Sequence, residues 1–226
     1  IDFYLKLDVC LLSDIFEEFR GYCHKNHNLD CANYYTLPGF AFDAFLKMTG
    51  IKIRLTDDYD KILMLSSAIR GGISQSVMRY AVANNPYIPE TYDPTKPNSY
   101  IQYLDVTALY AHTMCKPLPY DDYEWVEGGE IELLKKNLLE LPNEGEYGYI
   151  IQCDISIPIS SHRTHSDFGF LCENKVPPLE GSKHSKLLIT LEDKKDYVIH
   201  FVALKQALQH GLILQKIHRA IRLRKK

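Results

Sequence analysis

The sequence predicts an α+β protein, built from an antiparallel sheet with helices. Segments with helical spacing come first in the chain, and segments with the alternation typical of strands come later, mixed with further helices. This order lacks the regular strand–helix alternation that produces a parallel sheet. Of the 226 residues, 46% are apolar and 24% are charged, which is ordinary usage for a chain that folds by burying a core.

Helices are predicted in the first third of the chain. Apolar residues recur at intervals of three and four between residues 3 and 19, with charged residues between them. A second helix over 40–48 follows a proline and closes at Gly50, a residue suited to the left-handed C′ position. A third helical segment over 57–69 stops at a glycine pair.

Strands are predicted in the middle of the chain. Residues 73–82 have an extended pattern, and a loop with four prolines over 84–98 is expected to connect them at the surface to a strand that begins at Tyr100. The remaining predicted elements are a strand at 147–159 and helices at 130–141 and 199–210, with a polar loop over 160–185.

Charge is nearly balanced along most of the chain. The net charge of −3 gives no global signal of nucleic-acid binding. The last eleven residues nevertheless contain six positive charges, from Lys216, Arg219, Arg222, Arg224, Lys225 and Lys226. We expect this segment, as a helix or strand, either to lie along phosphates or to form a solvated basic face.

The six cysteines have no repeated spacing, and several lie in apolar runs. This pattern predicts free thiols and an intracellular protein, for which the nucleus is one fitting compartment. No run of eighteen apolar residues is present, so no membrane partner is expected. The first residues contain neither an initiator methionine nor a signal-peptide pattern, which we interpret as the start of a fragment.

Three segments contain residue types suited to chemistry. Tyr4 and Asp8 lie four apart on a predicted helix and therefore share a face, where a carboxylate suits a divalent metal. The same spacing also arises by chance on helix surfaces. Arg70, Gly71, Gly72 and Arg79 mark a turn whose amides and guanidinium groups suit a phosphate backbone, although paired glycines are common in plain turns.

The third segment runs from Asp105 to Tyr110. An apolar strand is expected to deliver the Asp105 carboxylate to a turn, and the Tyr110 hydroxyl would flank an incoming sugar. Mg²⁺ used in phosphoryl transfer needs oxygen ligands held rigidly in this way. The alternative is an aspartate that caps the following turn.

In order and in approximate spacing, these segments resemble landmarks of family B DNA polymerases of the protein-primed branch, found in phages and in large self-synthesising transposons. Residues 4–8 look like the third motif of the 3′–5′ exonuclease, with Asp8 as a metal ligand and Tyr4 beside it. Residues 70–72 are similar to the glycine-pair motif that couples template binding between the exonuclease and polymerase sites. Residues 105–110 resemble the first palm motif.

The resemblance includes residues 32–50 and continues to residue 223, with specific departures. Ala108 stands where the motif usually has serine, Ala111 where it has proline, and Ile69 where an aromatic residue often precedes the arginine. By resemblance, residues 1–31 are the end of the exonuclease domain, 32–116 the N-terminal half of the palm, and 117–226 the terminal-protein-region insertion.

The resemblance implies a DNA-directed DNA polymerase that uses two Mg²⁺ (or Mn²⁺) ions, a DNA template and primer, deoxynucleotides and a terminal priming protein. It assigns catalytic roles to Asp105, Tyr4 and Asp8, with Asp105 and Asp8 as metal ligands, nucleotide contacts to Val106, Leu109 and Tyr110, and DNA contacts to Arg70, Gly71, Gly72, Arg79, Arg222 and Arg224.

Several motifs of a complete polymerase are not found in the sequence. They are an Asp-x-Glu exonuclease motif ahead of residues 4–8, the lysine helix of the fingers and the second palm aspartate, so we expect the isolated chain to be inactive. Two alternatives remain open: a non-catalytic nucleic-acid-binding relic, and an unrelated hydrolase that uses Asp8 and Asp105 together. We favour separate sites for these two carboxylates.

Two further groups of residues are weak metal candidates. Cys23, His24, His27 and Cys31 contain zinc-ligand types, but the adjacent Cys23 and His24 fit one tetrahedral ion poorly. We expect His162, His165 and His184 to be solvated. For the main site, we predict that Asp105 ends a central antiparallel strand, faces a cleft and lies near a strand over 151–157.

Overall fold

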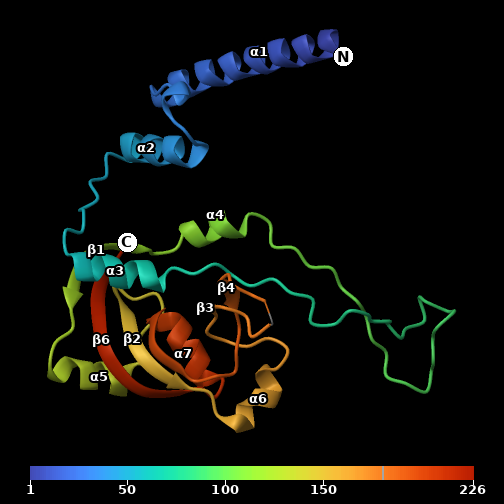
Figure 1. Ribbon diagram of the computed structural model, residues 1–226, viewed down its shortest axis with the longest axis vertical. Helices are drawn as coiled ribbons and strands as arrows, with labels where there is room; N and C mark the ends of the chain where they lie inside the picture. Colours follow the sequence, from blue (N-terminus) through green and yellow to red (C-terminus); the bar gives the residue numbers. More distant parts are fainter. Residues whose placement is uncertain (180) are drawn as a thin grey trace. The chain divides into compact units, whose positions relative to one another are not determined.

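We describe the chain from a computed structural model, in which residues 1–179 and 181–226 are described (Figure 1). The chain divides into two compact units, residues 1–54 and residues 55–226, and each is treated by itself. The predicted borders at 31/32 and 116/117 stay predictions. No helix of the described residues is long and apolar enough to span a membrane.

The first unit contains α1 (Asp2–His27), a short 3₁₀ helix (Cys31–Asn33) and α2 (Leu37–Thr49). The helix predicted over 3–19 is confirmed, and it continues for two more turns. It ends where Asn28 adopts a left-handed conformation with φ of 50° and donates its N–H to the carbonyl of His24. Most of α1 is exposed, including apolar residues such as Phe3.

A small core joins the end of α1 to α2. Its buried members are Cys23, Cys31, Phe40 and Ala44. Arg20 braces this turn through two parallel hydrogen bonds to Asp30, from Nε to Oδ1 at 2.8 Å and from Nη2 to Oδ2 at 2.6 Å. Helix α2 also matches its prediction, and Gly50 caps it with φ of 62° as expected.

The second unit is built on a four-stranded sheet. Its strands are β1 (Pro119–Trp125), β2 (Tyr147–Ser156), β5 (Lys194–His200) and β6 (Ile213–Lys225), in the order β1-β6-β2-β5. All pairs are antiparallel. A separate pair consists of β3 (Glu173–Lys175) and β4 (Lys186–Leu188). The predicted α+β class is therefore confirmed.

Helices cover both faces of this sheet. Side chains alternate along β2, so Ile151, Cys153 and Ile155 point into a core shared with α5 (Gly129–Asn137) and α7 (Phe201–Gln209). Ile150 points to the opposite face, where it packs with Met64 of α3 (Tyr59–Ala68). Figure 1 shows α7 lying against β2, with β6 curving along the sheet.

Helix α3 is fixed at its start by Asp58. The Oδ1 atom of Asp58 accepts the backbone N–H groups of Asp60 and Lys61, which is an N-cap, and Oδ2 accepts the indole N–H of Trp125 on β1. The hydrogen bond from Lys61 is the main reason why the pKa of Asp58 lies below its usual value. One carboxylate thus caps the helix and holds it to the sheet.

Two predicted strands are wrong. Residues 73–82 and 100–106 belong to no strand of the structure, so Asp105 does not end a strand and does not pair near 151–157. The β-prone residues are present, but Tyr103 and Leu104 are 93% and 82% exposed. A strand needs a neighbour for its N–H and C=O groups, and the described residues supply none here.

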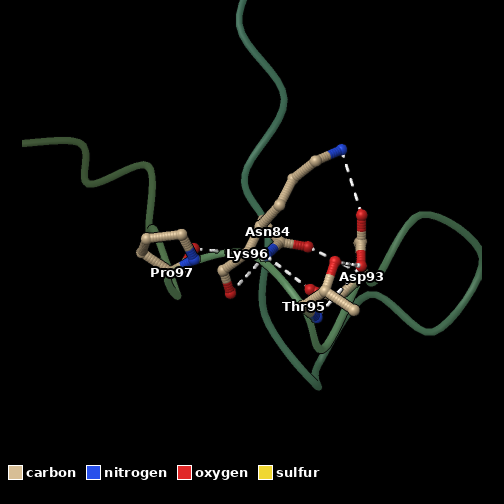
Figure 2. A network of polar contacts seen from close by, with 5 residues as sticks. All are labelled: Asn84, Asp93, Thr95, Lys96 and Pro97. Atoms are coloured by element: carbon tan, nitrogen blue, oxygen red, sulfur yellow. Dashed lines mark hydrogen bonds and ion pairs between the residues drawn. The ribbon is translucent and has the colours of Figure 1, made fainter.

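The proline-containing loop between these segments is confirmed. Asn84 is its centre: Nδ2 donates to the carbonyls of Asp93, Lys96 and Pro97, and Oδ1 accepts the N–H of Asp93 at 2.7 Å (Figure 2). The N–H of Ser99 donates to the carbonyl of Asn84, which closes the loop. Side-chain hydrogen bonds replace the ladder bonds of a sheet in this segment.

Several elements of the second half were not predicted. Strands β1 and β5 were missed, and the predicted loop over 160–185 contains α6 (Ile159–His165) and β3. The prediction of a solvated His165 is wrong, because it is 5% exposed, with Nε2 2.9 Å from the carbonyl of His210. All six cysteines are free.

Candidate nucleic-acid interface

Asp105 lies in an extended segment that leads into a tight turn. The predicted turn is present at Thr107 and Ala108 and is followed by α4 (Leu109–Met114). Ala108 has φ of 51°, a left-handed conformation that costs a residue with a Cβ about 1–2 kcal/mol. Its carbonyl accepts the N–H of His112 at 3.0 Å, so the first bond of α4 stabilises this turn.

The residues around this turn are open to solvent. Tyr110 is 84% exposed, and Val106 and Leu109 are exposed as well. No hydrogen bond or ion pair connects Asp105 to another of the described residues. Its carboxylate is therefore available as a hard oxygen ligand of the kind that Mg²⁺ prefers.

The donor set near Asp105 is incomplete for a clamped ion. Within residues 1–179 and 181–226, one group of three His, Cys, Asp or Glu ligand atoms lies close together, and it consists of Asp154, Asp196 and His218. Asp105 and Asp8 belong to no such group. Each is a carboxylate ligand that Mg²⁺ accepts, but neither is part of a three-ligand set within the described residues.

Tyr4 and Asp8 lie on α1, as predicted. Both are exposed, and their spacing of four places them on one face of the helix. This geometry suits a surface that contributes one carboxylate to a site assembled from several elements. It makes no site by itself.

Arg70 is held against the sheet directly after α3. Its Nη1 atom donates to the carbonyl of Val198 at 2.6 Å, and its guanidinium lies 4.1 Å from the centre of the Tyr197 ring. These contacts combine a charge-assisted hydrogen bond with a cation–π interaction. Burial raises the pKa of Tyr197 to about 12, although the positive charge of Arg70 acts in the opposite direction.

The two glycines after Arg70 continue this segment without special strain. Neither has a positive φ, so the conformational freedom expected for a tight turn is not used. A Cβ at Gly71 would meet Leu187 at 3.9 Å, an ordinary contact, and one at Gly72 would meet nothing within 4 Å. Both glycines are exposed, which leaves their backbone open to a large ligand.

A polar pocket of about 400 Å³ opens beside Arg70 on the α3-facing side of the sheet. Two further cations line it, Lys195 and Arg219, together with uncharged polar side chains from Ser66, Ser67, Gln152 and Asn174. Glu173 and Asp196 also line it, but the Oε1 atom of Glu173 pairs with Lys194 at 2.5 Å. Arg70, Lys195 and Arg219 form no ion pair with a carboxylate of the described residues, which gives the pocket the character of an anion-binding surface.

The other predicted DNA-binding arginines differ from Arg70. Arg79 is exposed on the extended segment. Arg222 and Arg224 lie on β6, where they form ion pairs with Glu124 at 2.6 Å and Glu146 at 2.9 Å. The basic end of the chain is thus a sheet strand in which Arg222 and Arg224 already have acidic partners, whereas Arg219 has none among the described residues.

Comparison with known protein families matched residues 3–222 to the family described as DNA polymerase type B, organellar and viral. The chain belongs to this polymerase family. No curated protein and no solved structure matched it. The resemblance drawn from the three motifs is therefore confirmed at the level of the family.

Family membership indicates which ligands the pocket beside Arg70 could meet. DNA polymerases act on DNA and nucleotides, which are polyanions, and the surface beside Arg70 offers cations to phosphate. Sequence reasoning missed Lys195 and Tyr197 as members of this surface, whereas Arg219 was expected to meet phosphate as one of the six charges at the end of the chain. Arg219 pairs with Gln152 of β2 and therefore lies on the face that α3 covers. Lys195 and Tyr197 flank the bulge at Asp196, so no regular alternation along β5 could have placed them.

Proposed function

We propose that the chain is the part of a protein-primed family B DNA polymerase that joins editing, template binding and synthesis. In this proposal residues 1–31 end the exonuclease domain, 32–116 form the first half of the palm, and 117–226 form the terminal-protein-region insertion. The observation that carries it is the family match over residues 3–222, which includes all three motifs in order. The phage or transposon branch and an intracellular setting belong to the same proposal.

Asp105 would contribute one oxygen ligand to the polymerase metals. Divalent Mg²⁺ (or Mn²⁺) supplies Lewis-acid stabilisation of the transferred phosphoryl group when it is bound. The exposed Asp105 carboxylate is unpaired within the described residues, so it is free to take this role. Val106, Leu109 and Tyr110 follow on one short turn and would flank the nucleotide, with the Tyr110 ring beside the sugar.

Asp8 would serve a different ion, with Tyr4 beside it. Each carboxylate is one ligand of an incomplete set, because neither belongs to a group of three among the described residues. Two such ions must be clamped by several carboxylates for in-line transfer. We therefore expect no nucleotide incorporation by this chain alone.

DNA binding does not need the complete metal site. Arg70, Lys195 and Arg219 line one pocket, and the exposed glycine pair lies at the end of α3 beside it. Cations on a surface of this kind bind phosphate without reading the sequence. Arg79 is exposed and could add a further phosphate contact, whereas Arg222 and Arg224 must first leave their glutamate partners.

The 226-residue chain should bind single-stranded or primed DNA weakly and should fail to extend a primer with Mg²⁺. About three phosphate contacts would give a slope of roughly −2 for log affinity against log salt, at about −0.7 per contact on single strands. Fluorescence anisotropy at several salt concentrations measures this slope. Incorporation by the purified chain, or DNA binding that is absent or independent of salt, would contradict the proposal.

Variants that remove positive charges test which side chains form the DNA-binding surface. The double variant Lys195→Gln/Arg219→Gln should make the slope less steep by about 1.4, because each of the two cations neutralises one phosphate and each phosphate accounts for about 0.7. The matched control Arg222→Gln/Arg224→Gln removes two cations that are paired with glutamates and should change the slope less. Asp105→Ala should leave binding unchanged without Mg²⁺, because that carboxylate contacts metal rather than phosphate.

The second candidate function is a non-catalytic nucleic-acid-binding relic. The exposure of the Asp105 segment favours it, since Asp105 belongs to no group of three metal-ligand side chains among the described residues. The two candidates differ when the chain is joined to the rest of the polymerase motifs in one reading frame. Primer extension by that longer protein, lost on Asp105→Ala, supports the polymerase, and the lack of extension supports the relic.

A further inference from the structure

Three side chains from neighbouring strands converge on the α3-facing side of the sheet. Asp154 lies on β2, Asp196 on β5 and His218 on β6, so the central strand contributes one ligand and its two neighbours one each. On β2, Asp154 follows the alternation of Ile150 and Gln152 and therefore points away from the main core. None of the three residues has a role in the polymerase motifs.

Two bulges bring these side chains together. The β2–β5 register shifts between Cys153 and Ile155, and Asp196 adopts φ of 52° at that point. The β2–β6 register shifts between Gln152 and Cys153, which makes His218 the extra residue on β6. A bulge changes the direction of a side chain relative to a regular strand, and here two of them aim their residues at Asp154.

The ligand atoms are spaced as a metal ion requires. The Nε2 atom of His218 lies 2.9 Å from Oδ1 of Asp154 and 3.6 Å from Oδ1 of Asp196, and all three ligand atoms lie within 4.8 Å of one another. Ligands at about 2.0 Å from a tetrahedral zinc ion are about 3.3 Å apart. The observed distances fall on both sides of this value.

The imidazole nitrogen in this group lacks a proper hydrogen bond. The Nε2 atom of His218 is buried, and its approach to Asp154 does not meet hydrogen-bond geometry. It nevertheless points at two carboxylates. A buried polar atom needs a partner, and a cation between the nitrogen and the two oxygens would provide one.

Neighbouring groups orient both carboxylates. The backbone N–H of Asp196 donates to Oδ1 of Asp154 at 2.9 Å, and the Gln152 amide donates to Oδ1 of Asp196 at 3.2 Å. Gln152 is fixed in turn by Arg219, whose Nε donates to its Oε1 at 2.8 Å. Such outer hydrogen bonds hold the ligands of protein metal sites in position.

The charges and exposure of the group suit a dication with one open position. Two carboxylates and a neutral imidazole carry a charge of −2, and the nearby cations Lys216 and Arg219 lie at the edge of the group. The side chains of His218 and Asp154 are 26% and 29% exposed, whereas that of Asp196 is 68% exposed. Water can therefore reach the ion on the Asp196 side, which borders the pocket beside Arg70.

We propose that Asp154, Asp196 and His218 form a site for a divalent transition-metal ion, with Zn²⁺ as the preferred ion and water as its fourth ligand. One imidazole nitrogen with two carboxylate oxygens favours such an ion over Mg²⁺, which prefers oxygen ligands alone. Bound metal would tie β5, β2 and β6 together next to the phosphate-binding pocket. Neither the polymerase metals nor DNA binding is needed to infer this site, although Asp196 also lines the pocket beside Arg70.

Cobalt substitution tests the site in the 226-residue chain. Co²⁺ titration, followed by visible absorption and competed by Zn²⁺, should give one equivalent of a low-symmetry site with nitrogen and oxygen ligands. The spectrum should lack the near-ultraviolet charge-transfer band of thiolate ligation, which would indicate the exposed Cys10 or Cys115 instead. Absence of binding, or a thiolate band, would overturn the proposal.

Matched variants assign the ligands. Asp196→Asn should weaken Zn²⁺ binding at least about tenfold, since even the loss of an orienting partner has an effect of that size. Asp122→Asn is the control, because Asp122 is also an aspartate with a positive φ, 56°, in the same sheet. His218→Gln should abolish the Co²⁺ spectrum while the far-ultraviolet circular dichroism is kept. Equal affinities in Asp196→Asn and Asp122→Asn would overturn the assignment.

Discussion

The sheet over residues 119–225 and the segment over residues 70–116 lie in the same unit but differ in how they are stabilised. In the sheet, Ile151, Phe201 and Leu204 are completely buried, and every strand has an antiparallel partner. In the segment, β-prone residues are exposed, and the backbone between 100 and 106 forms no ladder. The segment contains Asp105, and the sheet contains none of the three motifs.

This difference shows that a strand pattern predicts a strand only where the chain also provides its neighbour. Side chains such as Tyr103 and Leu104 have the pattern, but their burial depends on a second surface that the described residues do not contain. The sheet is stabilised by its own contacts. The region with the predicted catalytic residues is positioned by local hydrogen bonds, as in the loop around Asn84.

The largest effect that separates the two regions is expected from a matched pair of leucine substitutions. Leu204→Ala removes a completely buried side chain and should lower the free energy of unfolding by about 2–5 kcal/mol. Leu104→Ala, at a position 82% exposed, should change it by less than about 0.5 kcal/mol. Urea denaturation followed by circular dichroism measures both. Similar losses would show that the segment is packed after all.

A second pair of substitutions tests whether Arg70 connects the segment over residues 70–116 to the sheet. Arg70 contacts Val198 and Tyr197 of β5, so Arg70→Ala should lower the free energy of unfolding by about 1–3 kcal/mol. Arg79→Ala, at an exposed position, should leave it unchanged. If both variants unfold at the wild-type urea concentration, Arg70 does not hold the segment to the sheet.

The smallest expected effect is a shift in the pKa of Asp93, which lies in the loop of Figure 2. The side-chain hydrogen bond from Thr95 is the main cause that lowers the pKa of Asp93 to about 2, with a further contribution from Lys96. Because the folded-state pKa is depressed, this stabilisation is present above the ordinary value of about 3.8 and is lost as the pH falls towards 2.

Thr95→Val should therefore raise the pKa of Asp93 towards its ordinary value, as followed by NMR titration of its side-chain carboxyl carbon. Thr113→Val is the control, because the Thr113 hydroxyl donates to Leu109 within α4 and is remote in sequence from the loop. An unshifted midpoint in Thr95→Val would contradict the network drawn around Asn84.

The sequence contained enough information for the longer helices and for β2, but not for the short helices α4 and α6. Helical spacing located α1, α2, α3 and α7 to within a few residues, apart from the end of α1, and Gly50 marked a helix end correctly. Strands β1 and β5 were missed because each mixes charged with apolar residues without a regular alternation. Their identity comes from pairing with β6 and β2, which is a long-range property of the fold.

The sequence predicted several residues of the candidate site, but it did not predict how they are arranged in space. Asp105, Arg70 and Asp8 were found from local motifs, and their family is confirmed, while their roles stay predictions. Lys195 and Arg219, in contrast, reach the Arg70 pocket only through the register of β5 and β6. The group of Asp154, Asp196 and His218 depends on two β-bulges, and no local sequence pattern predicts these bulges.

Hydrogen–deuterium exchange on the 226-residue chain tests the central contrast most directly. Amides of β2 and β6 should exchange slowly, because they form ladder bonds in a buried sheet. Amides over 73–82 and 100–106 should exchange at least about a hundred times faster, since no strand protects them. Protection of residues 100–106 equal to that of β2 would contradict the account, because Asp105 would then end a strand of a stable sheet.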